Sequence, residues 1–200
     1  MTDGILSDSE IEAAVKNEDI FIDPYNPKHV NPVSYDLTLG RGVVVYASWV
    51  RPWANLLGAE DGSRFEPLSG ILDVKERPVL HEYRIDPSLG WVLKPGIGYL
   101  MHTQEIIRTH KYEPVLDGKS SVGRLFIQTH CTAGYGDPGF SGQYTLEVLV
   151  RHTVRVYPGM RIAQIRFHTI SGDIARPYDG NYKGADATGA VVSKCWKQFV

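Results

Sequence analysis

Side chains of the types that carry out acid–base and phosphate chemistry gather in one stretch, residues 117–150, between apolar runs. Its first part, residues 118–124, reads GKSSVGR. Two cations, two hydroxyls and the N–H groups that glycine leaves accessible form a set that can hold phosphate oxygens. The order differs from the G-x-x-x-x-G-K-[ST] order of a P-loop, so a basic surface turn is an equally good interpretation of these residues alone.

The second part, residues 132–142, places four glycines around one carboxylate, Asp137. Glycine lets the backbone come close to a ligand, and the Asp137 carboxylate could accept a hydrogen bond from a sugar hydroxyl. Gly-Asp-Pro-Gly is also ordinary turn chemistry, and the residues alone favour that structural role. Ligand binding is the alternative for this part.

The third part is Glu147, which lies in a run from Tyr144 to Val150 that predicts a mostly buried strand. Burial raises the pKa of a carboxyl group because it disfavours the anion, and such a group can take up and return protons near neutral pH. An outward-facing strand residue, or a buried ion pair with an arginine, is an equally good account of Glu147.

Short strands must position these side chains. Along the chain, 20 glycines and 12 prolines separate short apolar runs, and many short strands with regular turns are typical of a sandwich or barrel. We expect strands at residues 42–47, 90–93, 98–102, 125–129, 143–150 and 161–168. One helix is expected at about residues 8–17, because Ser7 and Glu10 form a capping-box pattern before an apolar face.

Composition and charge narrow the domain organisation and the partners. The 200 residues, of which 42% are hydrophobic, suffice for one sizeable core, so a single domain over residues 1–200 is expected. The formal net charge is −2, and the 21 basic and 23 acidic residues are spread along the chain. Because no block of like charge occurs, neither a nucleic-acid polymer nor a membrane is an expected partner.

A cytoplasmic location is expected. The N-terminal segment does not have the pattern of a secretory leader, and no apolar run reaches the roughly 18 residues of a membrane helix. The two cysteines, Cys131 and Cys195, lie far apart in unlike surroundings. They suit a reducing compartment and offer no Cys-x-x-Cys metal site.

Two segments are less regular. Residues 49–78 carry scattered Pro, Gly and Asp residues and are expected to form a long insertion or loop. The tail, about residues 178–200, holds small and polar residues before an aromatic and basic end. This composition suits a mobile C-terminal arm that orders over a ligand or a neighbouring subunit.

Taken together, the three parts of the 117–150 stretch resemble the dCTP deaminase family of the dUTPase-like superfamily. The family pattern is Gly-basic-Ser-Ser, then Asp-Pro-Gly-aromatic-Ser-Gly, then Leu-Glu. It is matched in order and spacing at residues 118–121, 137–142 and 146–147. Further matches at residues 6–8, 22–24, 92–96 and 176–178 extend the resemblance over nearly the whole chain, apart from residues 49–78.

The resemblance implies an all-β fold, a distorted β-barrel or jelly roll of the dUTPase-like type with a short N-terminal helix. It also implies a homotrimer with active sites at the subunit interfaces, and dCTP or a related deoxycytidine nucleotide as substrate. The catalytic residues that it implies are Glu147, Ser120 and Arg124. The substrate-binding residues that it implies are Lys119, Ser120, Ser121, Val122, Gly123 and Arg124 at the phosphates and the reacting end, Asp137 at the deoxyribose 3′-hydroxyl, Thr145 and Leu146 at the base, and Gln164 and Tyr178 from further along the chain.

The implied chemistry is hydrolytic deamination without zinc, because the chain lacks the H-x-E and P-C-x-x-C pair of the zinc deaminases. Glu147 would take a proton from a water held by Ser120, hydroxide would add to C4 of cytosine, and Glu147 would then protonate the departing ammonia. Arg124 would stabilise the developing charge. No metal site is expected in the protein itself, and Mg²⁺ would accompany only the triphosphate.

Gly134 and Tyr135 indicate how far the reaction goes. Family members that only deaminate often carry a His-Arg pair after Thr-Ala, whereas members that also cleave the triphosphate tend to have Gly followed by an aromatic residue. The chain therefore resembles the bifunctional type, which forms dUMP, ammonia and pyrophosphate from dCTP.

The C-terminal arm departs from the family's Lys-Tyr-x-Gly-x-Gln pattern, because residues 181–186 read NYKGAD. Lys183 could supply the missing charge from a shifted position, or the substrate could be a 5-modified cytosine nucleotide. Three alternatives stay open: a deaminase that stops at dUTP, a plain dUTPase, and a non-catalytic nucleotide-binding regulator. Glu147 and Phe140 argue against the plain dUTPase, which has no need of an acid–base group in this strand and tends to have Tyr at the Phe140 position.

Overall fold

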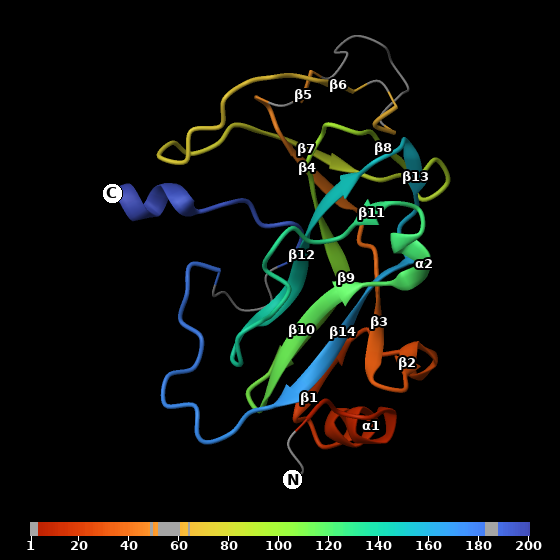
Figure 1. The fold of residues 1–200 in the computed structure, drawn as a ribbon, viewed down its shortest axis with the longest axis vertical. Helices are drawn as coiled ribbons and strands as arrows, with labels where there is room; N and C mark the ends of the chain where they lie inside the picture. Colours follow the sequence, from red (N-terminus) through yellow and green to blue (C-terminus); the bar gives the residue numbers. More distant parts are fainter. Residues whose placement is uncertain (1–3, 49, 52–60, 64, 183–187) are drawn as a thin grey trace.

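The computed structural model of the chain describes residues 4–48, 50–51, 61–63, 65–182 and 188–200, and one helix, α1 (Asp8–Lys16), precedes the strands (Figure 1). The Ser7 N–H group donates to the Glu10 carboxylate at 2.9 Å, which satisfies a backbone donor at the helix start. Ile11 and Ala14 are the buried residues of the helix. The predicted N-terminal helix is confirmed, and it ends one residue before the predicted residue 17.

Two antiparallel sheets carry most of the strands. The larger has the order β11-β12-β9-β4-β7, and β1 also pairs with β9. Its strands are β1 (Ile20–Asp23), β4 (Gly42–Tyr46), β7 (Leu80–Arg84), β9 (Tyr99–Thr109), β11 (Ile127–Gln128) and β12 (Ser141–Val150). The smaller has the order β10-β14-β3-β2, and its strands are β2 (Val30–Asn31), β3 (Ser34–Thr38), β10 (Tyr112–Gly118) and β14 (Arg161–Thr169).

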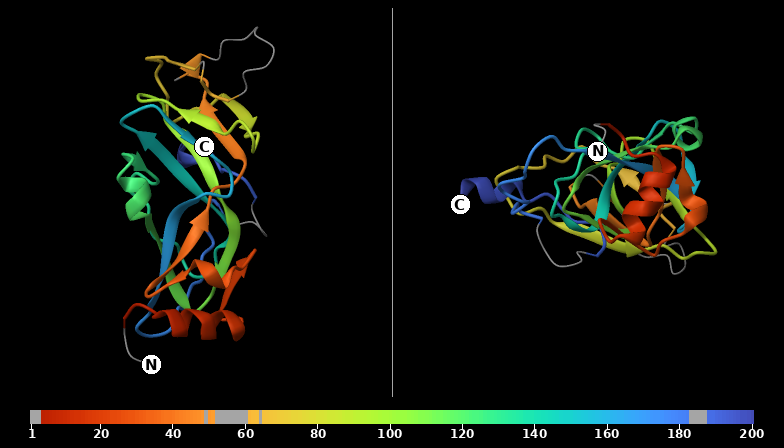
Figure 2. Two further views of the ribbon diagram at one scale, coloured as in Figure 1. Left: turned by 90° about the vertical axis from the view of Figure 1, so that its right-hand side faces the viewer. Right: turned by 90° about the horizontal axis from the view of Figure 1, so that it is seen from below.

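Short elements complete the fold. Strand β8 (Trp91–Leu93) pairs with β13 (Val154–Val156), and β5 (Val50–Arg51) pairs with β6 (Glu66–Pro67). Single helical turns form at η1 (Pro27–His29), α2 (Ser120–Gly123) and η2 (Cys195–Phe199). Helix α1 lies across one end of the sheets, and β5 and β6 lie at the opposite end (Figure 2). Much of the irregular segment 49–78 lies outside the described residues, and its described backbone contains the β5–β6 pair.

The core lies between the two sheets. In β12, Leu146, Val148 and Val150 are buried, whereas Glu147 and Leu149 on the opposite face are not. Strand β14 contributes buried side chains from the other sheet, and all of these belong to one hydrophobic cluster. The all-β fold with a short N-terminal helix is confirmed. The described strands form open sheets, and no closed barrel is found among them.

The described part of the C-terminal arm runs along one side of the molecule and ends in η2 (Figure 1). Three alternate backbone N–H groups of the arm donate to side chains of the large sheet. Gly189 donates to the Gln143 side-chain oxygen at 2.6 Å, residue 191 to the Thr145 hydroxyl at 2.9 Å, and residue 193 to the Tyr46 hydroxyl at 3.3 Å. The arm therefore contacts β12 and β4 of its own chain, and its mobility stays a prediction.

Candidate active site

A pocket of about 500 Å³ opens on the face of the large sheet that points away from the core. Val44 of β4, Leu100 of β9 and Glu147 of β12 are Cα partners in three successive strands, so their side chains share one face. The floor is formed by Tyr46, Leu100, Gln143, Thr145 and Glu147. The 133–140 hairpin forms one wall, and Tyr178, Tyr182 and the arm close another side.

Glu147 is held in place by a backbone donor. The Cys131 N–H group donates to Oε2 of Glu147 at 2.8 Å. Glu147 is half-buried, and it lies on the strand face opposite the core, as in the alternative of an outward-facing strand residue. The physical reason is alternation, because Leu146 and Val148 point into the core and Glu147 between them points to the pocket. The strand thus presents one oriented carboxylate to a space that can hold a ligand.

Cys131 is not equipped to act as a nucleophile. Partial desolvation of the Cys131 thiol, an exposed residue overall, raises its pKa, and the negative charge of Glu147 raises it further. A thiol with a raised pKa stays protonated near neutral pH, and the thiolate is the reactive form. Of this residue, the backbone N–H group is the part that contributes to the site, through its bond to Glu147.

Asp137 and Tyr178 lie on the hairpin side of the pocket. Gly139 has a φ of +96°, a conformation that glycine adopts readily, and it closes the turn after Asp137. The Tyr178 N–H group donates to the Pro138 carbonyl at 3.1 Å, which ties the start of the arm to the hairpin. The Phe140 ring meets the Tyr178 ring edge-on at 5.9 Å between centroids.

Thr145 and Leu146 occupy neighbouring positions with different surroundings. Thr145 lines the pocket and its hydroxyl accepts the hydrogen bond from residue 191 of the arm. The Leu146 side chain is fully buried in the core. Leu146 can therefore contact a base only through its backbone groups.

The basic segment at residues 119–124 does not line the pocket of its own chain. It forms the α2 turn, in which Ser120, Ser121 and Arg124 are exposed, whereas the Val122 side chain is buried in the core. The predicted site residue Gln164 is also outside the pocket. It lies on β14 as the Cα partner of Asp117 and of Asp36, so it belongs to the smaller sheet beside the 119–124 segment.

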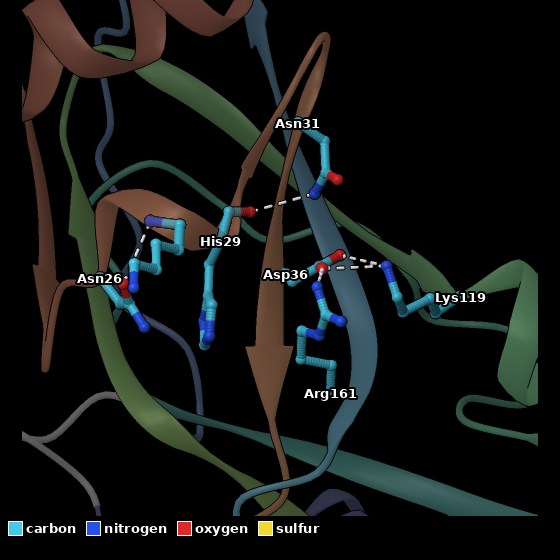
Figure 3. Close-up of polar contacts among 7 residues, drawn as sticks. Asn26, His29, Asn31, Asp36, Lys119 and Arg161 are labelled. Atoms are coloured by element: carbon cyan, nitrogen blue, oxygen red, sulfur yellow. Dashed lines mark hydrogen bonds and ion pairs between the residues drawn. The ribbon is translucent and has the colours of Figure 1, made fainter.

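Lys119 is engaged by a buried carboxylate. Its Nζ lies 2.8 and 2.9 Å from the two oxygens of Asp36, and Asp36 has no exposed side-chain surface. Arg161 reaches the same carboxylate at 3.2 Å. Figure 3 shows the two cations approaching Asp36 from different sides, next to the turn that carries His29 and Asn31. The cluster of Asp36, Lys119 and Arg161 contains two cations and one carboxylate, so it carries a net positive charge.

The structure thus sorts the predicted site residues into two groups. Asp137, Thr145, Glu147 and Tyr178 meet at the pocket. Residues 119–124 and Gln164 lie together elsewhere. Sequence reasoning missed several pocket residues, among them Tyr46, Gln143 and Tyr182. Gln143 could have been found by its spacing from Thr145 and Glu147, whereas Tyr46 reaches the pocket only through the pairing of β4 with β9, which no local pattern reveals.

A group of three or more His, Cys, Asp and Glu side chains able to hold one metal ion does not occur among the residues that the structure describes. Within the same part of the chain, no helix is long and apolar enough to cross a membrane.

Comparison with known proteins assigns the family. A family model described as dCTP deaminase-like matches residues 5–170. The chain belongs to the dCTP deaminase family. The resemblance found in the sequence is confirmed, and the matched range includes the whole 117–150 stretch.

Relatives in the dCTP deaminase family align along nearly their full length. The chain is 37% identical over 195 residues to "dCTP deaminase, dUMP-forming" of Hathewaya histolytica, covering 98% of this chain and 99% of the relative. It is 38% identical over 195 residues to the protein of the same name from Leptospira biflexa, covering 98% of both chains. The C-terminal arm, which lies beyond the family match, is included in both of these alignments.

A solved structure shares the fold. The crystal structure of 2′-deoxycytidine 5′-triphosphate deaminase from Agrobacterium tumefaciens matches with a TM-score of 0.60 at 26% sequence identity. The match covers 84% of this chain and 47% of that chain. This chain therefore spans about half the length of the solved dCTP deaminase.

Proposed function

We propose that this member of the dCTP deaminase family converts dCTP to dUMP, ammonia and pyrophosphate. The observation that carries the proposal is the oriented Glu147 carboxylate, held by the Cys131 N–H group in a pocket of about 500 Å³. The names of the relatives from Hathewaya and Leptospira, "dCTP deaminase, dUMP-forming", support the same reaction.

Glu147 acts as the proton shuttle of the deamination. Its carboxylate accepts a proton from a water molecule, and the oxygen of that water forms a bond to C4 of cytosine. That proton passes from the Glu147 carboxyl to N3 of the ring. The proton of the new C4 hydroxyl then passes through Glu147 to the amino group, the C4–N bond breaks with loss of ammonia, and a carbonyl forms at C4. The Cys131 N–H group keeps Oε2 at a fixed place through these steps, and Glu147 ends the cycle as a carboxylate.

The second step cleaves the triphosphate. A water oxygen forms a bond to the α-phosphorus, and the bond from that phosphorus to the bridging oxygen breaks, which releases pyrophosphate and leaves dUMP. The support for this step is the Gly134-Tyr135 pair of the hairpin and the words "dUMP-forming" in the names of the relatives.

The phosphate side of the site is proposed to come from another copy of the chain. Lys119, Ser120 and Arg124, with residues 121–123 and Gln164, do not reach the pocket of their own chain, yet they are the residues that the family pattern assigns to phosphates and water. A homotrimer with sites between subunits would bring this segment of one copy to the Glu147 pocket of another, as closed symmetric assemblies allow. Ser120 would then place the attacking water, and Arg124 would stabilise charge.

Mg²⁺ is proposed to enter with the nucleotide. Magnesium keeps several waters and is commonly held by substrate phosphates with few protein ligands, so the residues present fit this role without a protein cage. It would neutralise phosphate charge, and no zinc is required by the proposed chemistry. A cytoplasmic location is proposed as well, and the two free, exposed cysteines suit its reducing conditions.

The test is product identification. The purified full-length chain is incubated with dCTP and Mg²⁺, and the products are separated by ion-exchange chromatography. The proposal expects dUMP and pyrophosphate without accumulation of dUTP. Accumulation of dUTP would identify a deaminase that stops after the first step, and turnover of dUTP without turnover of dCTP would identify a dUTPase. If neither nucleotide is turned over, the chain is a binding protein and the proposal is wrong.

A further inference from the structure

Tyr144 is a pocket residue to which the proposed reaction gives no role. It lies at a shift in the β12–β9 register between Gln143 and Thr145, and its N–H group donates to the Thr103 hydroxyl at 2.9 Å. An irregularity of this kind re-aims a side chain relative to its neighbours in the strand. Together with Gly136 and Asp137 of the hairpin, Tyr144 lines the pocket.

The hairpin leaves room for the Tyr144 hydroxyl. A Cβ atom added at Gly136 would overlap that hydroxyl oxygen and would also lie 3.2 Å from the Tyr144 ring. Glycine at position 136 therefore makes space for the end of the tyrosine. The ring itself is fixed by an edge-on contact with Phe140, with 5.3 Å between centroids.

The hydroxyl is kept as a hydrogen-bond donor. Burial raises the pKa of Tyr144, and the negative charge of Asp137 raises it further, so the phenol stays protonated throughout the neutral range. Within the described part of the chain, this hydroxyl has no hydrogen-bond partner. A donor without a partner thus lies against Gly136, the residue before Asp137, in the pocket that Asp137 also lines, and the Asp137 carboxylate is purely an acceptor when ionised.

A sugar hydroxyl both donates and accepts hydrogen bonds, as the side chains of Ser and Thr do. A carboxylate beside a phenol offers one group of each kind, so the pair can satisfy one hydroxyl completely. A site that satisfies a substrate hydroxyl rejects an analogue that lacks it, because its polar groups are then left unpaired.

We infer that Tyr144 is a specificity-determining residue that donates a hydrogen bond to the 3′-oxygen of the deoxyribose, while the 3′-hydroxyl donates to Asp137. This inference rests on the proposed function and deepens it, because it assigns a second ligand to the sugar end of the same pocket. Tyr144 and Asp137 therefore discriminate between nucleotides by the presence of a 3′-hydroxyl, and not by the identity of the base.

The test compares dCTP with 2′,3′-dideoxy-CTP, which lacks the 3′-hydroxyl. Wild type and Tyr144→Phe are measured with both nucleotides, by kcat/KM for ammonia release and by calorimetric Kd. Loss of one neutral hydrogen bond should lower kcat/KM and affinity for dCTP about fivefold, and should leave the dideoxy nucleotide unchanged. Tyr157→Phe, an exposed tyrosine outside the pocket, should change neither nucleotide.

Several outcomes overturn the inference: an equal loss on both nucleotides, no loss on dCTP, or a wild type that binds neither nucleotide. If the wild type binds dCTP in preference to the dideoxy analogue but releases no ammonia, and Tyr144→Phe removes the preference, the sugar assignment stands and the proposed deamination is wrong. Should Tyr144→Phe fail to fold, Gly136→Ala gives the same test, because its Cβ displaces the hydroxyl and should cause the same selective loss.

Discussion

At the scale of single residues, the structure separates two kinds of buried or half-buried carboxylate. Glu147 accepts one backbone hydrogen bond and faces the pocket, where a ligand could contact its carboxylate. Asp36 is fully buried and forms ion pairs with Lys119 and Arg161, so its role is to stabilise the fold. The surroundings of each carboxylate therefore determine whether it faces a ligand pocket or stabilises the fold.

Replacing Asp36 by Asn should destabilise the fold. The Asn side chain cannot carry the negative charge that Lys119 and Arg161 share at this buried position. Breaking a buried ion pair costs about 3 kcal/mol of the free energy of unfolding. Urea denaturation of both proteins measures the loss. Asp19→Asn is the matched control, because the Asp19–Lys111 pair is partly exposed and should be worth less than about 1 kcal/mol. Equal losses of stability in the two variants would show that the buried Asp36 ion pairs contribute no more than an exposed ion pair.

Glu105 predicts a pH dependence of stability. It is buried, and its two carboxylate oxygens accept from the N–H group and the hydroxyl of Thr38 at 2.9 and 2.7 Å. Burial raises the pKa of Glu105 above 4.5, while the Thr38 bonds and the charge of His29 act in the opposite direction. A raised pKa in the folded state means that the stability from this group is present below about pH 4.5 and is lost as the pH rises through the folded value.

The variant that isolates this effect is Glu105→Gln, which can keep both bonds to Thr38 without a charge. Its free energy of unfolding relative to wild type should rise as the pH increases from 4.5 to 8, measured by urea denaturation at several pH values. Glu82→Gln, an exposed strand carboxylate, should show no such trend. A constant difference between Glu105→Gln and wild type over this range would contradict the account of Glu105.

At the scale of elements, the C-terminal arm is joined to the sheet by alternate N–H groups. The donors at residues 189, 191 and 193 meet Gln143, Thr145 and Tyr46, which gives the arm the two-residue period of a strand although its acceptors are side chains. The strength of this attachment rests on backbone donors, and proline removes a donor at a chosen position.

Val191→Pro should loosen the arm, because it removes the N–H group that donates to Thr145. We expect faster trypsin cleavage at Lys194 and Lys197, followed by mass spectrometry of the released peptides. Val192→Pro is the control, since the N–H group of Val192 is not one of the three donors of this row. Equal protection of the two variants would show that the row of N–H groups does not hold the arm.

The sequence predicts those elements whose pattern is local. The Ser7–Glu10 capping box marks α1, and apolar runs mark β4, β12 and β14. It did not reveal β3, because all five residues of SYDLT are buried despite their polarity, nor β10, which contains Pro114. Strand β9 continues to Thr109 beyond the predicted residue 102, because the polar residues that interrupt the apolar pattern are satisfied by neighbours, as Glu105 is by Thr38.

The candidate site shows the same limit. The pocket members that share the 117–150 stretch, Asp137, Thr145 and Glu147, could be found from the sequence because their roles depend on a local hairpin and one strand. Tyr46 lies at the pocket because β4 pairs with β9, a strand distant in the sequence. The arm residues lie there because their N–H groups donate to side chains of the sheet. The division of the predicted residues into two groups depends on tertiary geometry, which the spacing of a motif does not contain.

At the scale of the whole molecule, one chain carries two halves of the proposed site in different places. The Glu147 pocket lies on the large sheet, and the 119–124 segment follows β10 of the small sheet. The proposed homotrimer would unite the two halves, because it would bring different copies of the chain face to face. In such a trimer each site needs two copies of the chain, so activity depends on assembly.

Mixing two inactive variants tests the shared site. Glu147→Gln removes the proton shuttle, and Arg124→Ala removes a cation of the other half. If sites are shared, co-refolding the two variants in equal amounts should restore about a quarter of wild-type activity, because a random assembly pairs an intact pocket with an intact 119–124 segment at that frequency. Light scattering after size-exclusion chromatography checks the trimer mass. Activity that stays at the sum of the separate variants would contradict shared sites.

The most direct measurement of the central claim is ammonia release from dCTP by wild type and Glu147→Gln, with Glu82→Gln as the matched exposed carboxylate. The account predicts release by wild type and by Glu82→Gln, and a loss of at least about 10²-fold in kcat for Glu147→Gln, the scale expected for removal of a general acid–base group. Release at an unreduced rate by Glu147→Gln would contradict the account, because the proton shuttle would then have to be another group.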